Sequence, residues 1–363
     1  MSKPARILTI LAVAAAVGGC ASTRIPVAIA NPLCQDPATA NWLIIGPRGD
    51  VVDLAQGTMA TLKPFLHRVL GDAIDWKTAA FLPSRRGSYI ASTTLTTRIW
   101  LVNVRDEIYR QVDSPLENCS IMGMAWSPDE RRLLCYACRT VTGNIRQGRL
   151  FLLSIKDMKW QAIDAAGEVR GPNSGICADA WEDDQAFLYG SGGEIWRCDL
   201  DIGRCAKVLG SGAVPRSIGP RGFIYRRIVE GPESTWLKNR VYTMALTSAN
   251  GEVTEQVPLY REGRESEGPE PVYLELTPAR SPDYRYFIFI NRGLNNIPGY
   301  ESWGPMAVRD MWLYDTQTRS FSLLLAHNYP GGPIVGRIFD AITSASWVDA
   351  SPELLAQLRP YPT

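Results

Sequence analysis

The sequence predicts an all-β fold, and within that class a β-propeller of six four-stranded blades. Two observations support this: a short apolar strand around an aromatic residue recurs, and a turn-forming hairpin precedes most of its copies. The recurring segments are 42–45, 99–102, 150–153, 195–198, 241–244 and 311–314, with the aromatic residues Trp42, Trp100, Phe151, Trp196, Tyr242 and Trp312. From Trp100 the next aromatic residues follow after 51, 45, 46 and 70 residues, a period typical of one propeller blade.

Each of these hairpins has a first strand that ends in a turn and a second strand that is strongly apolar. The clearest copy is Trp126-Ser127-Pro128-Asp129, which leads into the apolar segment 133–136. Proline presets one turn dihedral, and Ser or Asp side chains bond back to the turn backbone. The other copies join Phe81 and Pro83 to 89–91, Trp181 to 187–189, Gly219 and Pro220 to 223–225, and Ser281-Pro282-Asp283 to 287–289.

The two ends of the chain each hold part of one more blade. Segments 346–349 and 354–356 resemble a first hairpin without an aromatic third strand after it, and Trp42 begins a third strand without a hairpin before it. Pairing the N- and C-terminal strands would complete the sixth blade, close the ring and remove exposed sheet edges. Seven blades are the alternative, because residues 55–76 have room for another sheet edge or a short helix.

Two short motifs carry a resemblance to a known family. Trp126-Ser-Pro-Asp and Ser281-Pro-Asp resemble the WD40-like repeats of the periplasmic propeller of the Tol-Pal system and of prolyl-oligopeptidase-type peptidases. The usual Gly after the Asp is replaced by Glu130 and Tyr284. The resemblance spans most of residues 41–358 and implies a fold rather than an activity.

The N-terminus has the layout of a secretory signal. Lys3 and Arg6 precede an apolar run over 7–17, which is shorter than the roughly 20 residues of a membrane-spanning helix. The residues before Cys20, Val-Gly-Gly, resemble the lipobox of bacterial lipoproteins, which implies that the Cys20 thiol carries diacylglycerol and further acyl chains such as palmitate. An ordinary signal peptide with an incidental cysteine is the alternative.

The residue after Cys20 bears on localisation. In Gram-negative lipoproteins an Asp at this position favours retention at the inner membrane, and Ala21 therefore implies the outer membrane, facing the periplasm. The expected organisation is a signal peptide over 1–19, a lipidated Cys and tether over 20–40, the propeller over 41–358 and a tail over 359–363. Display at the cell surface is a further alternative that the sequence does not separate from this one.

Charge argues against nucleic acid as a partner. Without residues 1–19 the chain keeps 36 basic and 37 acidic residues, because Lys3 and Arg6 are lost and no acid is. A nucleic-acid-binding surface needs a basic excess.

Seven cysteines remain besides Cys20, so at least one is expected to stay outside an internal disulfide. Cys198 and Cys205 would face each other across a hairpin that turns at 201–203, within the reach of a disulfide. Cys119 and Cys138 are a second candidate pair in a similar hairpin, and the sequence does not assign Cys34, Cys135 and Cys177. The alternative is that buried thiols fill core space.

The motifs that would indicate catalysis or cofactor binding are sparse. The two histidines, His67 and His327, have no Gly-x-Ser-x-Gly partner motif and are expected to be ordinary surface or turn residues. Asp199 and Asp201 match the opening of a calcium loop, but a hairpin turn explains them better, and the same holds for 182–184. Cys135 and Cys138 have redox spacing inside a predicted strand, where their side chains would point to opposite faces. No metal or cofactor is predicted.

These observations favour a non-catalytic lipoprotein whose propeller binds or scaffolds an envelope protein, as the Tol-Pal resemblance implies. The polar insertions 261–271 and 292–309 are places where recognition is often located. The alternative is a propeller hydrolase or lyase acting on envelope polysaccharide. An enzyme would gather carboxylates and a histidine in a deep pocket at one end of the channel, whereas a scaffold would expose an apolar or aromatic patch.

Overall fold

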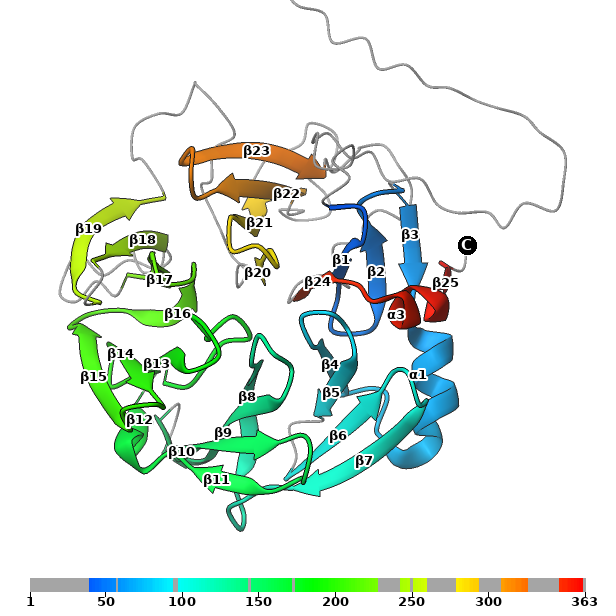
Figure 1. The fold of residues 1–363 in the computed structure, drawn as a ribbon, viewed down its shortest axis with the longest axis horizontal. Helices are drawn as coiled ribbons and strands as arrows, with labels where there is room; N and C mark the ends of the chain where they lie inside the picture. Colours follow the sequence, from blue (N-terminus) through cyan, green and yellow to red (C-terminus); the bar gives the residue numbers. More distant parts are fainter. Residues whose placement is uncertain are drawn as a thin grey trace, which may run out of the picture.

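The computed structural model describes residues 39–56, 58–93, 97–142, 145–171, 174–227, 242–248, 251–259, 279–293, 308–325 and 346–361. These residues form six antiparallel sheets arranged as blades around a central axis, with the last strand of each blade at the rim (Figure 1). The chain is therefore a six-bladed β-propeller, as predicted.

Blade 1 joins the two ends of the chain. Its strand order is β24, β1, β2, β3 and β25. Val348 of β24 lies opposite Leu43 of β1, which confirms that the ring is closed by pairing of N- and C-terminal strands. The bounds are β24 Ser346–Asp349, β1 Trp42–Ile45, β2 Asp50–Asp53, β3 Thr58–Thr61 and β25 Arg359–Pro360.

Three details of this closure differ from the sequence-based expectation. Trp42 lies in the second strand of its blade rather than the third, because the C-terminus contributes one strand and not a hairpin. Residues 354–356 belong to helix α3 (Pro352–Gln357), whose N-cap hydroxyl on Ser351 accepts a hydrogen bond from the Leu354 amide at 3.2 Å. The last described residues, expected as a tail, form β25, which pairs with β3.

Blades 2 and 3 follow along the chain, and each strand pairs with its predecessor. Blade 2 consists of β4 Ala80–Pro83, β5 Tyr89–Thr93, β6 Arg98–Asn103 and β7 Ile108–Asp113. Blade 3 consists of β8 Ser120–Trp126, β9 Arg132–Thr142, β10 Ile145–Ser154 and β11 Trp160–Ala162, with a short 3-10 helix η4 Asp164–Ala166 and an extra strand β12 Val169–Gly171 beside β10.

Blades 4 to 6 complete the ring. Blade 4 has β13 Ala186–Ser191, β14 Glu194–Asp199 and β15 Arg204–Leu209, and a bridge between Trp181 and Phe187 stands in for its inner strand. Blade 5 has β16 Ala213–Ser217, β17 Gly222–Arg226, β18 Tyr242–Thr247 and β19 Val253–Pro258. Blade 6 has β20 Ala279–Arg280, β21 Tyr286–Gly293, β22 Val308–Asp315 and β23 Ser320–Leu325.

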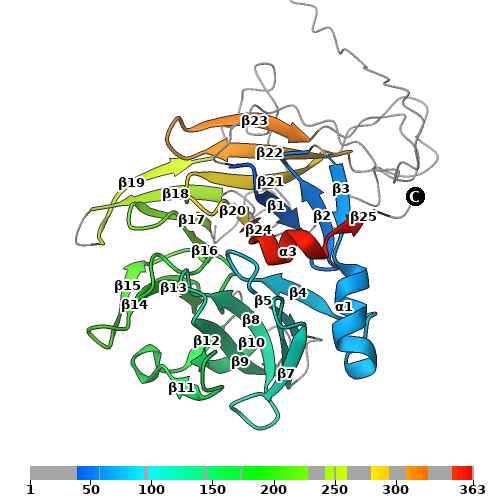
Figure 2. The same cartoon turned by 45° about the vertical axis from the view of Figure 1, so that its right-hand side comes forward.

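Residues 55–76, where the sequence allowed part of a seventh blade, contain the outer strand β3 of blade 1 and a helix instead. After β3 the chain turns into α1 (Lys63–Leu70) and a 3-10 helix η3 (Gly71–Ala73), which lie outside the ring beside α3 (Figure 2). Phe65, Leu66 and Leu70 of α1 pack into the core between blades 1 and 2. This amphipathic insertion covers the junction where the ring is closed.

Candidate functional site

Three blades share one turn chemistry between their first two strands. Ser127 accepts a hydrogen bond from the Arg132 amide at 3.0 Å and donates to Asp129 at 2.6 Å. Ser281 does the same with the Tyr286 amide and Asp283, and Ser84 accepts from the Tyr89 amide at 3.1 Å. We call the side of the ring formed by the turns 84–88, 127–131 and 281–285 the turn face.

The third residue after the serine in these turns has left-handed backbone geometry. Gly87 supplies it in blade 2 with φ +71°, whereas Glu130 and Tyr284 adopt φ +61° and +65° despite their side chains. Glutamate and tyrosine are disfavoured here, by about 1–2 kcal/mol. Outliers of this kind cluster at functional sites, so Glu130 and Tyr284 indicate that the turn face is a candidate functional site.

A hollow of about 1190 Å³ lies on the turn face between blades 2 and 3 and the start of α3. Tyr89, Ser154, Ile155, Gln185 and Ser351 contribute to its lining. Most of the remaining lining side chains are charged. They are the cations Arg105, Arg131, Arg132 and Lys156 and the anions Asp106, Asp129, Glu130 and Glu353.

Three of the four carboxylates accept hydrogen bonds from neighbouring side chains or backbone amides. Asp129 accepts from Ser127 and from the Arg131 amide at 3.0 Å. Glu130, only 8% exposed, accepts from the Arg86 amide at 2.5 Å, and Asp106 accepts from Asn103 at 2.8 Å. The hollow is therefore a prearranged polar surface with both signs of charge.

A smaller groove of about 220 Å³ adjoins the hollow and reaches the rim strand β7. Ile108 lines this groove and is 49% exposed, and its neighbour Tyr109 is 41% exposed. Large apolar side chains with this exposure are rare among the described residues; besides these two, only Ile202 at the tip of the β14–β15 hairpin is comparable. The hollow thus continues into a surface with apolar and aromatic side chains.

Charged residues from several blades converge in the central channel. Asp179, before β13, accepts from Arg216 of β16 at 2.7 Å and from the backbone amide of Arg280 at 3.2 Å. The Arg280 guanidinium donates to the carbonyls of Trp181 and Ser217 at 2.9 and 3.1 Å and lies 4.0 Å from the centroid of the Tyr284 ring. Residues 82, 83 and 85, residues 178–179 and residues 346–347, far apart in sequence, meet at this point.

His67 does not join this arrangement. His67 is exposed on α1, outside the ring, and its ring stacks on Trp76 with centroids 3.6 Å apart. His327 lies outside the described residues, as do residues 261–271 and most of 292–309. The cluster of Arg85, Asp179, Arg216 and Arg280 in the channel was missed, because its four members come from four different blades.

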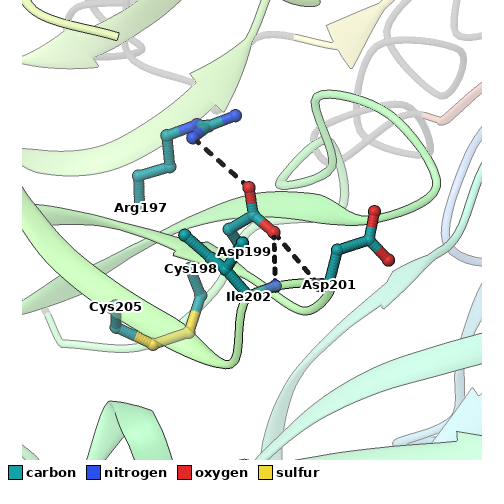
Figure 3. Close-up of a disulfide and its surroundings, with 6 residues drawn as sticks. All are labelled: Arg197, Cys198, Asp199, Asp201, Ile202 and Cys205. Carbon is teal, nitrogen blue, oxygen red and sulfur yellow. Dashed lines mark hydrogen bonds and ion pairs between the residues drawn. A yellow bond between two sulfur atoms is a disulfide. The ribbon is translucent and has the colours of Figure 1, made fainter. Parts of the chain in front are cut away.

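The first predicted disulfide is confirmed. Cys198 and Cys205 are direct partners across β14 and β15 and are bonded (Figure 3). The prediction of a second bond was wrong, because no disulfide joins Cys119 and Cys138, which are both buried. A bulge between Ile121 and Gly123 sets Cys138 opposite Ser120, so the neighbouring Cys119 points to the other face of the sheet.

Two further cysteines in the described part of the chain are free and buried, Cys135 and Cys177. Burial raises the pKa of both thiols, which keeps them protonated and unreactive. Cys135 packs in the core between blades 2 and 3, while Cys138 packs in the core between blades 3 and 4, as expected for side chains on opposite faces of a strand. Cys20 and Cys34 lie outside the described residues.

The hairpin next to the disulfide is a turn of the expected kind. The Asp199 carboxylate accepts from the Asp201 and Ile202 amides at 3.0 and 3.3 Å, and Gly203 has φ +61° (Figure 3). Arg197 lies 3.9 Å from the same carboxylate. Asp199 therefore serves the turn itself.

Within the described ranges, no group of three His, Cys, Asp or Glu side chains is arranged to hold a metal ion. Over the same residues, no helix has the length and apolar character needed to cross a membrane.

Comparison with known proteins yields propellers of low similarity. No family description and no curated protein matches this chain. A putative TolB from Agrobacterium tumefaciens is 13% identical, with 78% of this chain and 87% of that chain covered and a TM-score of 0.48. An oligogalacturonate lyase from Vibrio parahaemolyticus is 12% identical over 77% and 71%, with a TM-score of 0.47, and the Kuenenia stuttgartiensis hydrazine synthase is 17% identical over 69% and 67%, with a TM-score of 0.44. The assignment as a six-bladed propeller rests on the sheets and their pairing, described above.

Proposed function

We propose that this chain is a non-catalytic envelope lipoprotein whose propeller binds a protein partner on the turn face. The observation that carries the proposal is the hollow of about 1190 Å³ with four cationic and four anionic side chains. Small-molecule sites are mostly apolar and occupy about 300–1,000 Å³. A larger, mixed-charge hollow suits a protein surface with both signs of charge.

The adjoining groove supports the same assignment. Exposed Ile108 and the aromatic ring of Tyr89 add apolar and aromatic surface in the groove beside the charged hollow. Protein interfaces combine such a centre with a polar rim, and aromatic residues and arginine are enriched in them. The partner would then contact blades 2 and 3 together.

A lipid anchor at Cys20 is part of the same proposal. Acyl chains on Cys20 would hold the protein at the outer membrane, facing the periplasm. The tether of residues 20–40 would span up to about 65 Å when extended, at roughly 3.3 Å per residue. A propeller on such a tether can meet partners some distance from the membrane.

The test combines crosslinking in cells with two substitutions. Arg131→Glu reverses an exposed charge of the hollow, and we expect it to remove a recurrent crosslinked partner. Arg98→Glu is the matched control, because Arg98 is an exposed arginine paired with Asp113 at the opposite end of β6. Equal capture by the Arg131 and Arg98 variants would contradict the assignment of the hollow.

The anchor is tested separately. Cys20→Ser should move the protein from washed membranes to the soluble fraction and abolish capture of an envelope partner. Persistence of the variant in the membrane fraction would contradict the lipid anchor, whatever the outcome at the hollow.

A second candidate is a propeller hydrolase or lyase acting on envelope polysaccharide. The observation in its favour is that four carboxylates line one hollow, since acid and base pairs of this kind cleave glycosidic bonds. Purified protein would then release fragments from envelope polysaccharide, and Glu353→Gln, at the exposed start of α3, would abolish the release. Absence of fragments would leave the binding module as the assignment.

A further inference from the structure

Three arginines meet around one carboxylate inside the channel. Arg216 of blade 5 donates to Asp179 at 2.7 Å, and the Arg280 amide of blade 6 donates to the same oxygen at 3.2 Å. Arg85, in the turn after β4, donates to the Pro282 carbonyl of blade 6 at 2.5 Å. The Tyr284 ring lies next to two of the guanidinium groups: the Cζ atoms of Arg85 and Arg280 are 5.2 and 4.0 Å from its centroid.

Positive charge is in excess at this point. Asp179 balances one of the three guanidinium groups, and the nearby Glu182 is already paired with Arg197 at 2.5 Å. Arginine stays protonated in proteins, so the described residues leave about two positive charges in a partly buried place. Burial is the main cause that lowers the pKa of Arg280; Asp179 and Tyr284 oppose this shift, and the charges of Arg85 and Arg216 add to it.

Two buried donors near the excess charge have no acceptor among the described residues. They are Nε of Arg216, a residue that is 5% exposed, and Nε1 of Trp347, which is also 5% exposed. A buried polar group without a hydrogen bond is unfavourable, so each such donor in a native protein calls for a partner. Both are donors, and an oxyanion offers only acceptors.

A cavity lies beside Trp347, and Asp179, the ion-pair partner of Arg216, lies in its wall. It has a volume of about 50 Å³ and is lined by Arg85, Asp179, Arg280 and Trp347 together with the ends of the inner strands of blades 2, 3 and 6. One water-sized probe needs about 10–15 Å³, so the cavity holds roughly three to five atoms of that size. A carboxylate group has three heavy atoms.

We propose that the channel cavity binds one carboxylate group between Arg85, Arg280 and Trp347. The carboxylate would offset the excess positive charge, and two guanidinium groups with an indole donor match its acceptors. The inference is independent of the proposed partner on the turn face, because it concerns a different cavity and is measured without any partner.

The experiment is a thermal unfolding titration of the purified full-length protein. Sodium acetate replaces sodium chloride at constant ionic strength, which separates specific binding from screening. We expect a saturable rise in melting temperature of about 2 °C at a tenfold excess over Kd. A rise that is linear and unsaturated, or equal in the two salts, would overturn the proposal.

Three variants locate the effect. Arg280→Met removes the central guanidinium, and Arg85→Gln is the milder change at a partly exposed turn position that keeps folding intact. We expect Arg85→Gln to weaken acetate binding about tenfold, and Trp347→Phe about threefold to tenfold. Arg98→Gln, on the outside of blade 2, is the control and should bind as the parent does. Parent-like binding by both Arg85→Gln and Trp347→Phe would overturn the assignment.

A second arm distinguishes the sources of the carboxylate. An acetylated tripeptide with a free C-terminus that binds more tightly than acetate, while its amidated form does not bind, would identify a chain end. Binding of acetate alone would identify a small free carboxylate. Either result supports a carboxylate site, and binding of the amidated peptide with equal affinity would contradict it.

Discussion

At the scale of single residues, two of the seven described non-glycine residues with positive φ lie on the turn face. Glu130 and Tyr284 adopt left-handed geometry where blade 2 uses Gly87. Each side chain makes a contact that offsets the cost of this backbone geometry. Glu130 accepts a hydrogen bond from the Arg86 amide, and Tyr284 packs between Arg85 and Arg280. The missing glycines of the repeat are thus explained by contacts between blades.

The left-handed conformation at residue 130 predicts an unusual order of stability. Glu130→Gly and Glu130→Ala both lose the hydrogen bond to the Arg86 amide, but only glycine adopts positive φ without a Cβ penalty. Glu130→Gly should therefore be more stable than Glu130→Ala by about 1 kcal/mol in urea unfolding. At Arg110, an exposed strand position, the order should be reversed. The same order at both positions would contradict the backbone argument.

The disulfide predicts a measurable loss on reduction. Cys198 and Cys205 close a short loop, and removing such a bond costs about 2 kcal/mol. Reductant should lower the melting temperature of the parent but not of the double variant Cys198→Ser, Cys205→Ser. Peptide mapping without reductant should recover the two cysteines linked, and free thiols at both positions would contradict the bond.

At the scale of secondary-structure elements, the last position of the inner strand holds a tryptophan in blades 3 and 4 and an arginine in blade 6. Trp126 and Trp181 donate from their indoles to the carbonyls of Leu82 and Ala125, each in the preceding blade, at 3.0 Å. In blade 6 the corresponding position, opposite Phe287, is Arg280, which reaches the carbonyls of Trp181 and Ser217. A packing position in two blades has become a charged position in the channel.

The turn between β22 and β23 predicts a pH dependence. Burial raises the pKa of Asp315, but hydrogen bonds from Arg285 and from the Gln317 and Thr318 amides outweigh it and hold the pKa below its usual 3.8. Since the folded-state pKa is the lower one, this stabilisation is complete above about pH 3.8 and is lost as the pH falls through the lowered pKa. Asp315→Asn should therefore cost about 1 kcal/mol at neutral pH.

The measurement for Asp315→Asn is urea unfolding at neutral pH and at acid pH. The difference from the parent should shrink as the pH falls below 3.8, because the parent loses the charge that the variant lacks. Asparagine still accepts the turn amides, so the variant should fold. A difference that does not change with pH would contradict the role of the ion pair.

At the scale of the whole molecule, stability depends on closing the ring. β24 is the inner strand of blade 1 and pairs with β1 along its full length, and α3 then places Leu354 in the core between blades 1 and 2. A propeller that lacks this strand would expose the edge of β1 and the core beneath it. The last sixteen described residues therefore stabilise the N-terminal blade.

Two truncations test this closure. Ending the chain at residue 342 removes β24, α3 and β25, and the cooperative thermal transition should be lost. Ending it at Leu358 removes only β25 at the rim, and a cooperative transition should persist at a slightly lower temperature. An unchanged transition after the longer truncation would contradict ring closure as the source of stability.

Much of this architecture could be predicted because its signals are local. The aromatic strands, the Ser-Pro-Asp turns and the hairpin that pairs Cys198 with Cys205 all depend on residues within about one blade of each other. The signal for α3 was also present, since Ser351-Pro352-Glu353 is a helix start, but the apolar run 354–356 was interpreted as a strand. Local periodicity thus predicted the class and the first disulfide, and it favoured six blades over seven.

The sequence by itself determined the propeller class and favoured six blades with the two ends paired, because alternation and turn chemistry act over a few residues. Only the tertiary structure decided that Cys119 and Cys138 stay apart, since a single bulge changes which face a side chain occupies. It also decided where Arg85, Asp179, Arg216 and Arg280 meet. They lie on four blades, and only closure of the ring brings charges so distant in sequence to one point of the channel.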